Sequence, residues 1–312
     1  MERIIGRYEG KEKGPLLICL GSVHGNEPAG MKALELMFKM LEVEPITNPK
    51  FTFRGRLLGL RGNLRAIRAG KRFLEKDLNR HWTTENVQRI RRTDLNGLAN
   101  EDLEVRELLD VIETEIKNYQ PDKVILLDLH TTTAYGGIFT VVTDDLESLQ
   151  IGVELHAPVI KGLFNGVQGT ILQYFNRQNM GVPIVGVCFE SGQHQEELSI
   201  NRAIAAVTNC MRTIGCVRAE DVENQHDKLL IEFSRGLPKV SQLVKTHSIR
   251  LSDRFVMRPG YKNFQRVATG EVVADDKYGE IIIENNGLLL MPLYQKQGSD
   301  GFFLIESIDD SY

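Results

Sequence analysis

A histidine and a glutamate three residues apart, His24 and Glu27, follow an apolar run in the stretch LLICLGSVHGNEPAG at 16–30. Imidazole nitrogens and carboxylate oxygens are ligands that zinc prefers in proteins. Gly25 permits a tight turn that would let both side chains reach one ion, and Pro28 is typical of a helix start. Taken alone, such a pair is more often a helix cap or a surface pair. It therefore indicates a metal site only if further ligands exist.

A third candidate ligand, His130, ends the apolar run KVILLDLH at 123–130. Two histidines, one carboxylate and an open position form a usual catalytic zinc site, although iron(II) sites use the same ligand types. Asp128 shares the strand face of His130, so it is suited to orient a ligand. The alternative is that His130 is an ordinary hydrogen-bonded histidine at a strand end.

A further carboxylate, Glu190, ends the apolar run VPIVGVCFE at 182–190. Burial at a strand end raises the pKa of a carboxyl group, which suits a general base. Such a base would accept a proton from a metal-bound water and pass it to a leaving nitrogen. Taken alone, Glu190 is more simply interpreted as the ion-pair partner of a nearby lysine or arginine. Cys188 is expected on the same strand face and is interpreted as a packed thiol.

Arginines are frequent in RGNLRAIRAGKRF at 61–73, and another follows in DLNRHW at 77–82. Arginine binds carboxylates through two parallel hydrogen bonds. Asn79 and Arg80 are therefore candidates for holding a substrate carboxylate, and Arg65 is a candidate for stabilising an oxyanion at a scissile carbonyl. Without a partner motif, either arginine is interpreted as a solvated surface side chain.

These candidate residues stand at the ends of predicted strands. The predicted strands cover 15–23, 55–63, 123–130, 136–143 and 182–190, and the predicted helices cover 27–41, 100–116 and 195–215. Runs that are apolar on both faces predict an α/β fold, with a mainly parallel, mixed sheet flanked by helices. Ligands of such sheets bind beyond the carboxyl ends of strands, where His24, His130 and Glu190 lie.

The pattern changes after Cys216. Residues 217–228 are polar and are interpreted as a linker, and the alternating stretch GEVVADDKYGEIIIENNGLLLMP at 270–292 predicts β-structure. The sequence therefore predicts a catalytic α/β domain over 1–220 and a smaller β-rich domain over 221–312.

The composition excludes several classes of protein. The chain has 312 residues, 42% hydrophobic and 26% charged, which is ordinary for a globular protein. The net charge of −4 does not indicate a nucleic-acid partner, and RIRR at 89–92 is interpreted as a solvated helix face. No apolar run reaches the ~20 residues that cross a bilayer, and the N-terminus lacks a signal-peptide pattern. The cysteines form no CxxC pair, so we expect reduced thiols in a cytoplasmic protein.

Other catalytic motifs are missing. The chain has no G-x-S-x-G, no HExxH and no G-x-G-x-x-G with a downstream acidic residue, which disfavours a serine hydrolase, a thermolysin-like protease and a nucleotide site. The other histidines have no ligand-like partners and are interpreted as structural or surface residues, although one lies four residues past Glu190. They are His81, His156, His194, His226 and His247.

Five motifs occur in a characteristic order: HGNE at 24–27, N-x-R-A at 63–66, DLNR at 77–80, D-x-H-T-T at 128–132 and F-E-S-G at 189–192. With them the chain resembles the succinylglutamate desuccinylase/aspartoacylase family, which is related to the zinc carboxypeptidases. The resemblance covers about residues 14–215, and a smaller β-rich C-terminal domain is also expected of the family.

The resemblance implies a zinc-dependent deacylase with one Zn²⁺ per chain, which cleaves the amide bond of a small, acidic N-acyl amino acid. The implied zinc ligands are His24, Glu27 and His130, and the implied general base is Glu190. The implied oxyanion stabiliser is Arg65. Asn79 and Arg80 are implied to hold the substrate carboxylate. Further implied substrate contacts are Tyr174, Arg177 and Tyr294, although the spacing from Arg177 to Glu190 departs from the family pattern and the context of Tyr294 is weak.

Two alternatives remain beside the deacylase: a metallocarboxypeptidase that acts on peptide ends, and a catalytically silent protein that binds acyl-amino acids. A silent protein would have little reason to keep Glu190. We expect no nucleic-acid or membrane partner. The sequence gives no oligomeric state, and a homodimer is expected only because dimers are common.

Overall fold

The structure, a computed structural model, describes residues 1–221 and 225–309. Within these residues the strands form an eleven-stranded mixed sheet and a separate three-stranded sheet. In spatial order, the large sheet contains β1 (Ile4–Glu9), β3 (Arg54–Arg61), β2 (Glu12–Gly21), β4 (Val124–Thr132), β7 (Ile184–Gln193), β5 (Phe139–Val142), β6 (Val159–Lys161), β8 (Val240–Ser248), β14 (Asp300–Ser307), β13 (Gly287–Leu290) and β10 (Gln265–Val267). The small sheet contains β12 (Gly279–Ile282), β11 (Val272–Asp276) and β9 (Val256–Met257).

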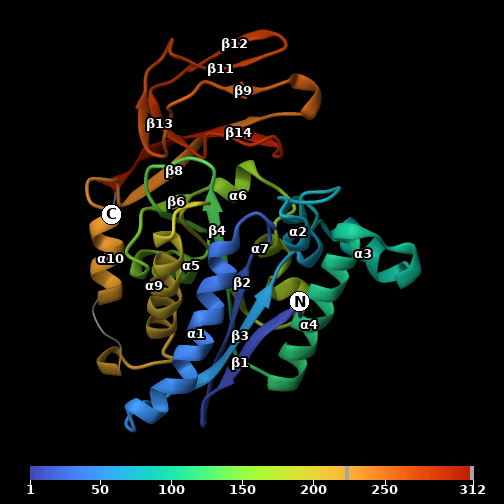
Figure 1. The fold of residues 1–312 in the computed structure, drawn as a ribbon, viewed down its shortest axis with the longest axis vertical. Helices are drawn as coiled ribbons and strands as arrows, with labels where there is room; N and C mark the ends of the chain where they lie inside the picture. The colour runs from blue at the N-terminus through green and yellow to red at the C-terminus, as the bar shows by residue number, and fades with distance from the viewer. Residues whose placement is uncertain (222–224, 310–312) are drawn as a thin grey trace.

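Helices cover both faces of the large sheet. They are α1 (Pro28–Thr47), α2 (Leu64–Ala69), α3 (Thr84–Arg92), α4 (Asn100–Tyr119), α5 (Leu146–Glu154), α6 (Leu163–Gly166), α7 (Ile171–Tyr174), α8 (Arg177–Met180), α9 (Leu198–Thr213) and α10 (Gln225–Phe233). Short 3₁₀ turns are η1 (Leu78–Arg80), η2 (Leu95–Gly97), η3 (Ala219–Asp221) and η4 (Leu251–Asp253). Figure 1 shows α1 and α9 on one side of the central strands and α4 on the other.

Strand β2 shows why these strands appear as continuous apolar runs in the sequence. Leu16 and Ile18 belong to the core cluster that contains residues of α3 and α4, whereas Leu17 and Cys19 belong to the cluster that contains residues of α1 and α9. Successive side chains of a strand point to opposite faces, so a strand covered on both sides must be apolar throughout. The predicted α/β fold with a mixed sheet is confirmed.

The central strands β3, β2, β4 and β7 are mutually parallel, and β1 and β5 add antiparallel neighbours to them. This order makes β2, β4 and β7 adjacent, with their carboxyl ends at the same edge. Three predicted strands that end in unusual polar residues are therefore neighbours in space.

The predicted linker over 217–228 is wrong in part, because α10 begins at Gln225; residues 222–224 lie outside the described residues. Leu230 of α10 is fully buried in the core cluster that contains residues of α9. The polar residues at the end of this segment, 225–228, thus form the first turn of an amphipathic helix, whose apolar residues come later.

The C-terminal part is rich in strands, as expected, and it continues the large sheet. β8 pairs in parallel with β6, with Val240 opposite Val159, and β14, β13 and β10 follow. Figure 1 shows β9, β11 and β12 at the far end of this part. The domain boundary near residue 220 stays a prediction. Among the described helices, none has the length and apolar character needed to cross a membrane.

Candidate metal and catalytic site

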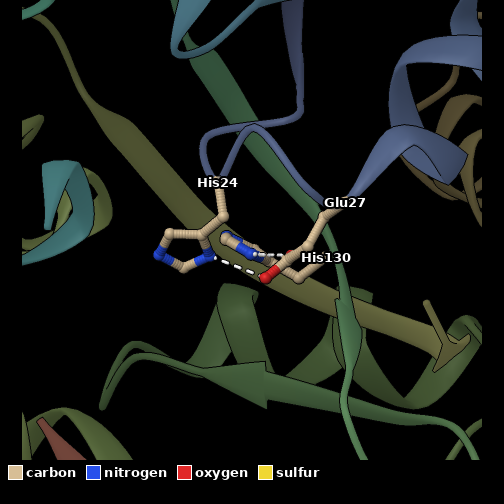
Figure 2. Close-up of side chains that lie close together, drawn as sticks. All are labelled: His24, Glu27 and His130. Atoms are coloured by element: carbon tan, nitrogen blue, oxygen red, sulfur yellow. Dashed lines mark hydrogen bonds and ion pairs between the residues drawn. The ribbon is translucent and has the colours of Figure 1, made fainter. Parts of the chain in front are cut away.

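The three predicted metal ligands converge on one point. His24 lies in the turn between β2 and α1, Glu27 immediately precedes α1, and His130 lies near the end of the adjacent strand β4. One ligand atom from each side chain lies within 4.8 Å of the others. Figure 2 shows the Glu27 carboxylate between the two imidazoles. Residues more than a hundred positions apart are thus brought together by the pairing of β2 with β4.

Each imidazole presents one nitrogen to Glu27 and has the other held by a second carboxylate. The Glu27 oxygens lie 2.9 Å from His24 Nδ1 and 2.9 Å from His130 Nδ1. His24 Nε2 lies 3.1 Å from Asp77 Oδ1, and His130 Nε2 lies 2.8 Å from Asp128 Oδ2. Metal-binding histidines are commonly oriented in this way by a carboxylate on the distal nitrogen. The geometry supports the orienting role predicted for Asp128.

The charges of the site favour a cation. Burial tends to raise the pKa of Glu27, but His24 and His130 lower it to well below its usual value, so this carboxylate is ionised. Burial likewise tends to lower the pKa of His130, but Asp128 and Glu27 raise it well above its usual value. The carboxylates that favour a charged imidazole also favour a metal ion between the two rings.

Close packing shapes the turn that carries His24 and Glu27. A Cβ atom on Gly25 would lie 2.3 Å from the carbonyl carbon of Ala66, so α2 leaves room only for glycine. The Gly25 N–H donates to the Arg72 carbonyl oxygen at 3.0 Å. Ser22 adopts φ 59°, which is unfavourable for a residue with a side chain, and its hydroxyl donates to the Glu27 carbonyl oxygen at 2.8 Å. The sequence analysis assigned Gly25 to a tight turn; in the structure, glycine is needed there because α2 approaches so closely.

A loop at 72–77 brings two residues to the site that the sequence analysis did not assign. Arg72 donates to Asp77 Oδ2 through Nε and Nη2, at 3.1 and 3.0 Å, and to Glu27 Oε1 at 3.3 Å. Burial tends to raise the pKa of Asp77, but Arg72 and His24 lower it well below its usual value. Asp77 could have been noticed as part of the DLNR motif. The spacing of the arginine-rich stretch, in contrast, does not show which guanidinium faces the predicted metal ligands.

The buried carboxylate of Glu101, in the first turn of α4, positions this loop. It accepts backbone N–H groups from Leu74, Glu75 and Lys76 at 2.7, 3.1 and 3.2 Å. Asn63 also donates to it at 3.1 Å. Because the three backbone bonds fix the chain between Arg72 and Asp77, these two side chains reach His24 and Glu27 in a defined orientation.

Glu190 lies on β7, directly opposite His130 on β4, and lines the same cavity. It is buried, and its Oε2 atom has no hydrogen-bond partner among the described residues. Burial and the nearby Glu27 and Asp128 charges raise its pKa to about 8, although His130 and Arg72 oppose this shift. A buried carboxylate with an unpaired oxygen is suited to exchange a proton. Burial also raises the pKa of the Cys188 thiol well above its usual value, which fits a packed thiol.

Asn79 and Arg80 also line the cavity. The Asn79 amide nitrogen lies 3.4 Å from His130 Nε2, and its oxygen accepts the Ile171 N–H at 3.0 Å. Arg80 donates to Asp300 Oδ2 at 2.6 Å. His194 lines the cavity as well, and its Nδ1 lies 2.7 Å from the Thr131 hydroxyl. The structure therefore places Asn79 and Arg80 in the same cavity as the predicted metal ligands. It also places His194 there, which the sequence analysis interpreted as a structural or surface residue.

Arg65 is not placed at the cavity. It donates to Glu104 Oε1 at 2.6 Å and to Glu107 Oε1 at 3.1 Å, both on α4. Glu104 is fully buried and requires cationic partners, so it draws the Arg65 side chain toward α4. Arg72, in the same arginine-rich stretch, lines the cavity instead.

The resemblance also implied substrate contacts for Tyr174, Arg177 and Tyr294, but none of these residues lines the cavity. Tyr174 is buried against Trp82 and Phe175, and Arg177 is exposed at the start of α8. The Tyr294 hydroxyl donates to backbone carbonyl oxygens of the C-terminal part. Their substrate contacts stay predictions, and neighbours of Tyr294 face the cavity instead.

Comparisons with known proteins show to which family the sequence is similar. Residues 13–214 match the family described as the succinylglutamate desuccinylase/aspartoacylase catalytic domain. A "Probable aspartoacylase" from a Nostoc species is 35% identical over 123 residues, 39% of this chain and 37% of the relative. A succinylglutamate desuccinylase from Pseudomonas putida is 34% identical over 96 residues, 29% of this chain and 27% of the relative. The aligned parts thus span well under half of these relatives.

Solved structures show the same fold over nearly the whole chain. A succinylglutamate desuccinylase/aspartoacylase from Rhodobacter sphaeroides has a TM-score of 0.67 at 17% identity, covering 98% of this chain and 88% of that chain. A succinylglutamate desuccinylase from Vibrio cholerae has a TM-score of 0.62 at 19% identity, covering 95% and 82%. The family match spans more than half of the sequence and confirms the resemblance carried by its motifs. The chain belongs to the succinylglutamate desuccinylase/aspartoacylase family.

Proposed function

We propose that the chain is a zinc-dependent deacylase that hydrolyses the amide bond of a small N-acyl amino acid. The observation that carries this proposal is the buried group of His24, Glu27 and His130, with the unpartnered Glu190 oxygen in the same cavity. Membership in a family that contains aspartoacylases and succinylglutamate desuccinylases supports the class of reaction.

The residues present fit a zinc ion. Two imidazole nitrogens and one carboxylate oxygen are a usual donor set for catalytic zinc, and the carboxylates on both distal nitrogens orient the rings. When bound, Zn²⁺ supplies Lewis acidity, which makes water a nucleophile at neutral pH and polarises a carbonyl.

The chain's own residues supply the remaining steps. Glu190 accepts a proton from the attacking water and delivers it to the amide nitrogen as the carbon–nitrogen bond breaks. Arg72 is held by Asp77 and Glu27 with its guanidinium at the cavity wall, where it stabilises the negative charge that develops on the carbonyl oxygen. Asn79 and Arg80 offer N–H donors for a substrate carboxylate.

Replacing Arg72 and Arg65 separately tests which arginine stabilises the oxyanion. Arg72→Ala is expected to lower kcat by roughly 100- to 1000-fold, because an oxyanion donor is lost. Arg65→Ala is expected to leave kcat within about threefold and to lower the melting temperature, because buried Glu104 loses a partner. Steady-state rates and thermal melting of both variants give the answer. A large loss of kcat in Arg65→Ala with little in Arg72→Ala would reverse the assignment.

Substrate class distinguishes the deacylase from the two alternatives. The zinc-loaded protein is expected to release amine from N-acetyl and longer N-acyl amino acids, and not from unmodified dipeptides. Faster cleavage of dipeptides or longer peptide ends would indicate a carboxypeptidase. Zinc binding without turnover of either class would indicate a silent binding protein.

A further inference from the structure

Part of the wall of the cavity beside the metal ligands is apolar. Its side chains come from β5, from the segment around α6 and α7, and from β14 in the C-terminal part. They include Val141, Leu163, Phe164, Val167, Leu172 and Phe303. All but Phe164 are almost completely buried. A substrate that reaches the metal ligands therefore places part of its surface against hydrocarbon.

Both arginines in the cavity wall are already paired. Of the described residues that line it, Arg72 and Arg80 are the arginines, and there is no lysine. Arg72 is bound by Asp77 and Glu27. Arg80 donates through Nη2 to Asp300 Oδ2 at 2.6 Å, and through Nη1 to the Asn79 carbonyl oxygen at 2.8 Å. Neither guanidinium is left as a free counter-ion for an additional substrate carboxylate.

Asp300 supplies the neutralising charge at Arg80. It stands at the start of β14, its side chain is 12% exposed, and Ser299 donates to the same Oδ2 atom at 3.1 Å. Carboxylates in the cavity wall (Glu27, Asp128, Glu190 and Asp300) outnumber the arginines. A substrate with one carboxylate can use the remaining N–H groups of Arg80. A second carboxylate near Arg80 would face Asp300 as a like charge.

We propose that this cavity selects N-acyl amino acids that carry a single carboxylate and an apolar substituent, and that Asp300 is the residue that discriminates against dicarboxylic substrates. This inference rests on the proposed function. It differs from the acidic substrate expected by resemblance. The apolar wall binds the uncharged substituent, and the Asp300–Arg80 pair removes the surplus positive charge that a second carboxylate requires.

A substrate panel tests the selectivity. N-acetyl-leucine, N-acetyl-aspartate, N-acetyl-lysine and N-succinyl-glutamate are compared by kcat/KM on the zinc-loaded protein, and the acyl chain is varied from acetyl to hexanoyl on leucine. N-acetyl-leucine is expected to exceed both acidic substrates by ~10-fold or more. Extension of whichever substituent meets the apolar wall is expected to raise kcat/KM by roughly threefold per methylene until the cavity is filled. A preference for either acidic substrate or for the lysine derivative would overturn the proposal.

Variants test the role of Asp300 separately. Asp300→Asn is expected to lower the leucine-to-aspartate ratio of kcat/KM by roughly 10-fold or more, because the charge of Arg80 is then no longer neutralised by Asp300. The matched control is Asp110→Asn, an exposed aspartate on α4 that pairs with Arg106, which is expected to leave the ratio unchanged. An unchanged ratio in Asp300→Asn would refute the assignment.

Binding distinguishes failure of the selectivity from failure of the proposed function. Calorimetric titration of the same N-acyl amino acids into zinc-loaded Glu190→Gln protein measures affinity without turnover. Tighter binding of N-acetyl-leucine than of N-acetyl-aspartate supports the selectivity, whether or not the wild type hydrolyses any substrate. Absence of hydrolysis by the wild type would refute only the proposed deacylase activity. Tighter binding of the aspartate derivative would refute the selectivity itself.

Discussion

Replacing Glu190 by glutamine is expected to lower kcat by roughly 100- to 10,000-fold while the zinc content of the protein stays unchanged. The amide keeps the size of the side chain but cannot accept a proton from water. Glu190 lies in the cavity but is not one of the three converging metal ligands, so metal binding should survive. Initial rates and zinc content, measured on the same preparations, test this result.

The pH dependence of kcat/KM provides a second test of Glu190 as the general base. A general base acts only when it is deprotonated, so kcat/KM of the wild type should fall as the pH drops through the pKa of Glu190. Burial raises this pKa to about 8, well above the usual value for a carboxyl group, and so shifts the acid limb to higher pH. The charge of a bound zinc ion lowers the pKa and moves the acid limb to lower pH.

The acid limb should be missing from Glu190→Gln, because the group that titrates has been removed. The matched control is Glu197→Gln, which changes an exposed glutamate just before α9 and should leave rate and profile intact. A Glu190→Gln protein that keeps more than about a tenth of the wild-type kcat would contradict the role of general base.

Removing the metal is expected to abolish turnover, and adding zinc to restore it. In His130→Ala only two of the three ligands remain, so zinc should neither bind stoichiometrically nor restore activity. The substitution also leaves Glu27 and Asp128 buried without their shared cationic partner, which should cost about 3 kcal/mol of stability. Zinc per chain, thermal melting with and without added zinc, and the rate after zinc addition measure these effects.

Two further variants make the metal experiment specific. Asp128→Asn, which changes the carboxylate that orients His130, should weaken zinc binding by roughly 10- to 100-fold without removing a ligand. His156→Ala is the control, because this histidine pairs with Asp227 and does not line the cavity. Full zinc occupancy in His130→Ala would show that the metal binds elsewhere.

Much of this site could be predicted because it lies at the ends of apolar runs. His130 and Glu190 end buried strands, and His24 follows one. In a parallel sheet such ends share an edge, so their meeting follows once β2, β4 and β7 are neighbours. The apolar runs identify the strands, but their order in the sheet depends on packing between distant segments.

The choice between Arg65 and Arg72 shows what local pattern leaves undetermined. Both arginines belong to one basic stretch, and their side chains are chemically identical. What separates them is that α4 presents buried Glu104 to the first and that Glu101 fixes the loop that carries the second. Both carboxylates are distant in sequence, so only the folded chain reveals which guanidinium faces the metal ligands.

The sequence pattern also did not predict that C-terminal residues contribute to the site. Asp300 and Phe303 lie more than a hundred residues beyond Glu190 and belong to none of the recognised motifs. Alternation of polar and apolar residues predicts strands in this part, but it does not predict which cavity a strand end will face. Likewise β1 and β6 were not predicted as strands.

The parallel pairing of β6 with β8 affects any attempt to shorten the chain. Cutting at the predicted boundary near residue 220 would expose the backbone N–H and C=O groups of β6, a ready template for association between molecules. The same cut would remove Asp300 and Phe303 from the cavity wall and expose the remaining apolar lining to water. The segment that carries the motifs therefore supplies only part of the cavity wall, and strands of the C-terminal part supply the rest.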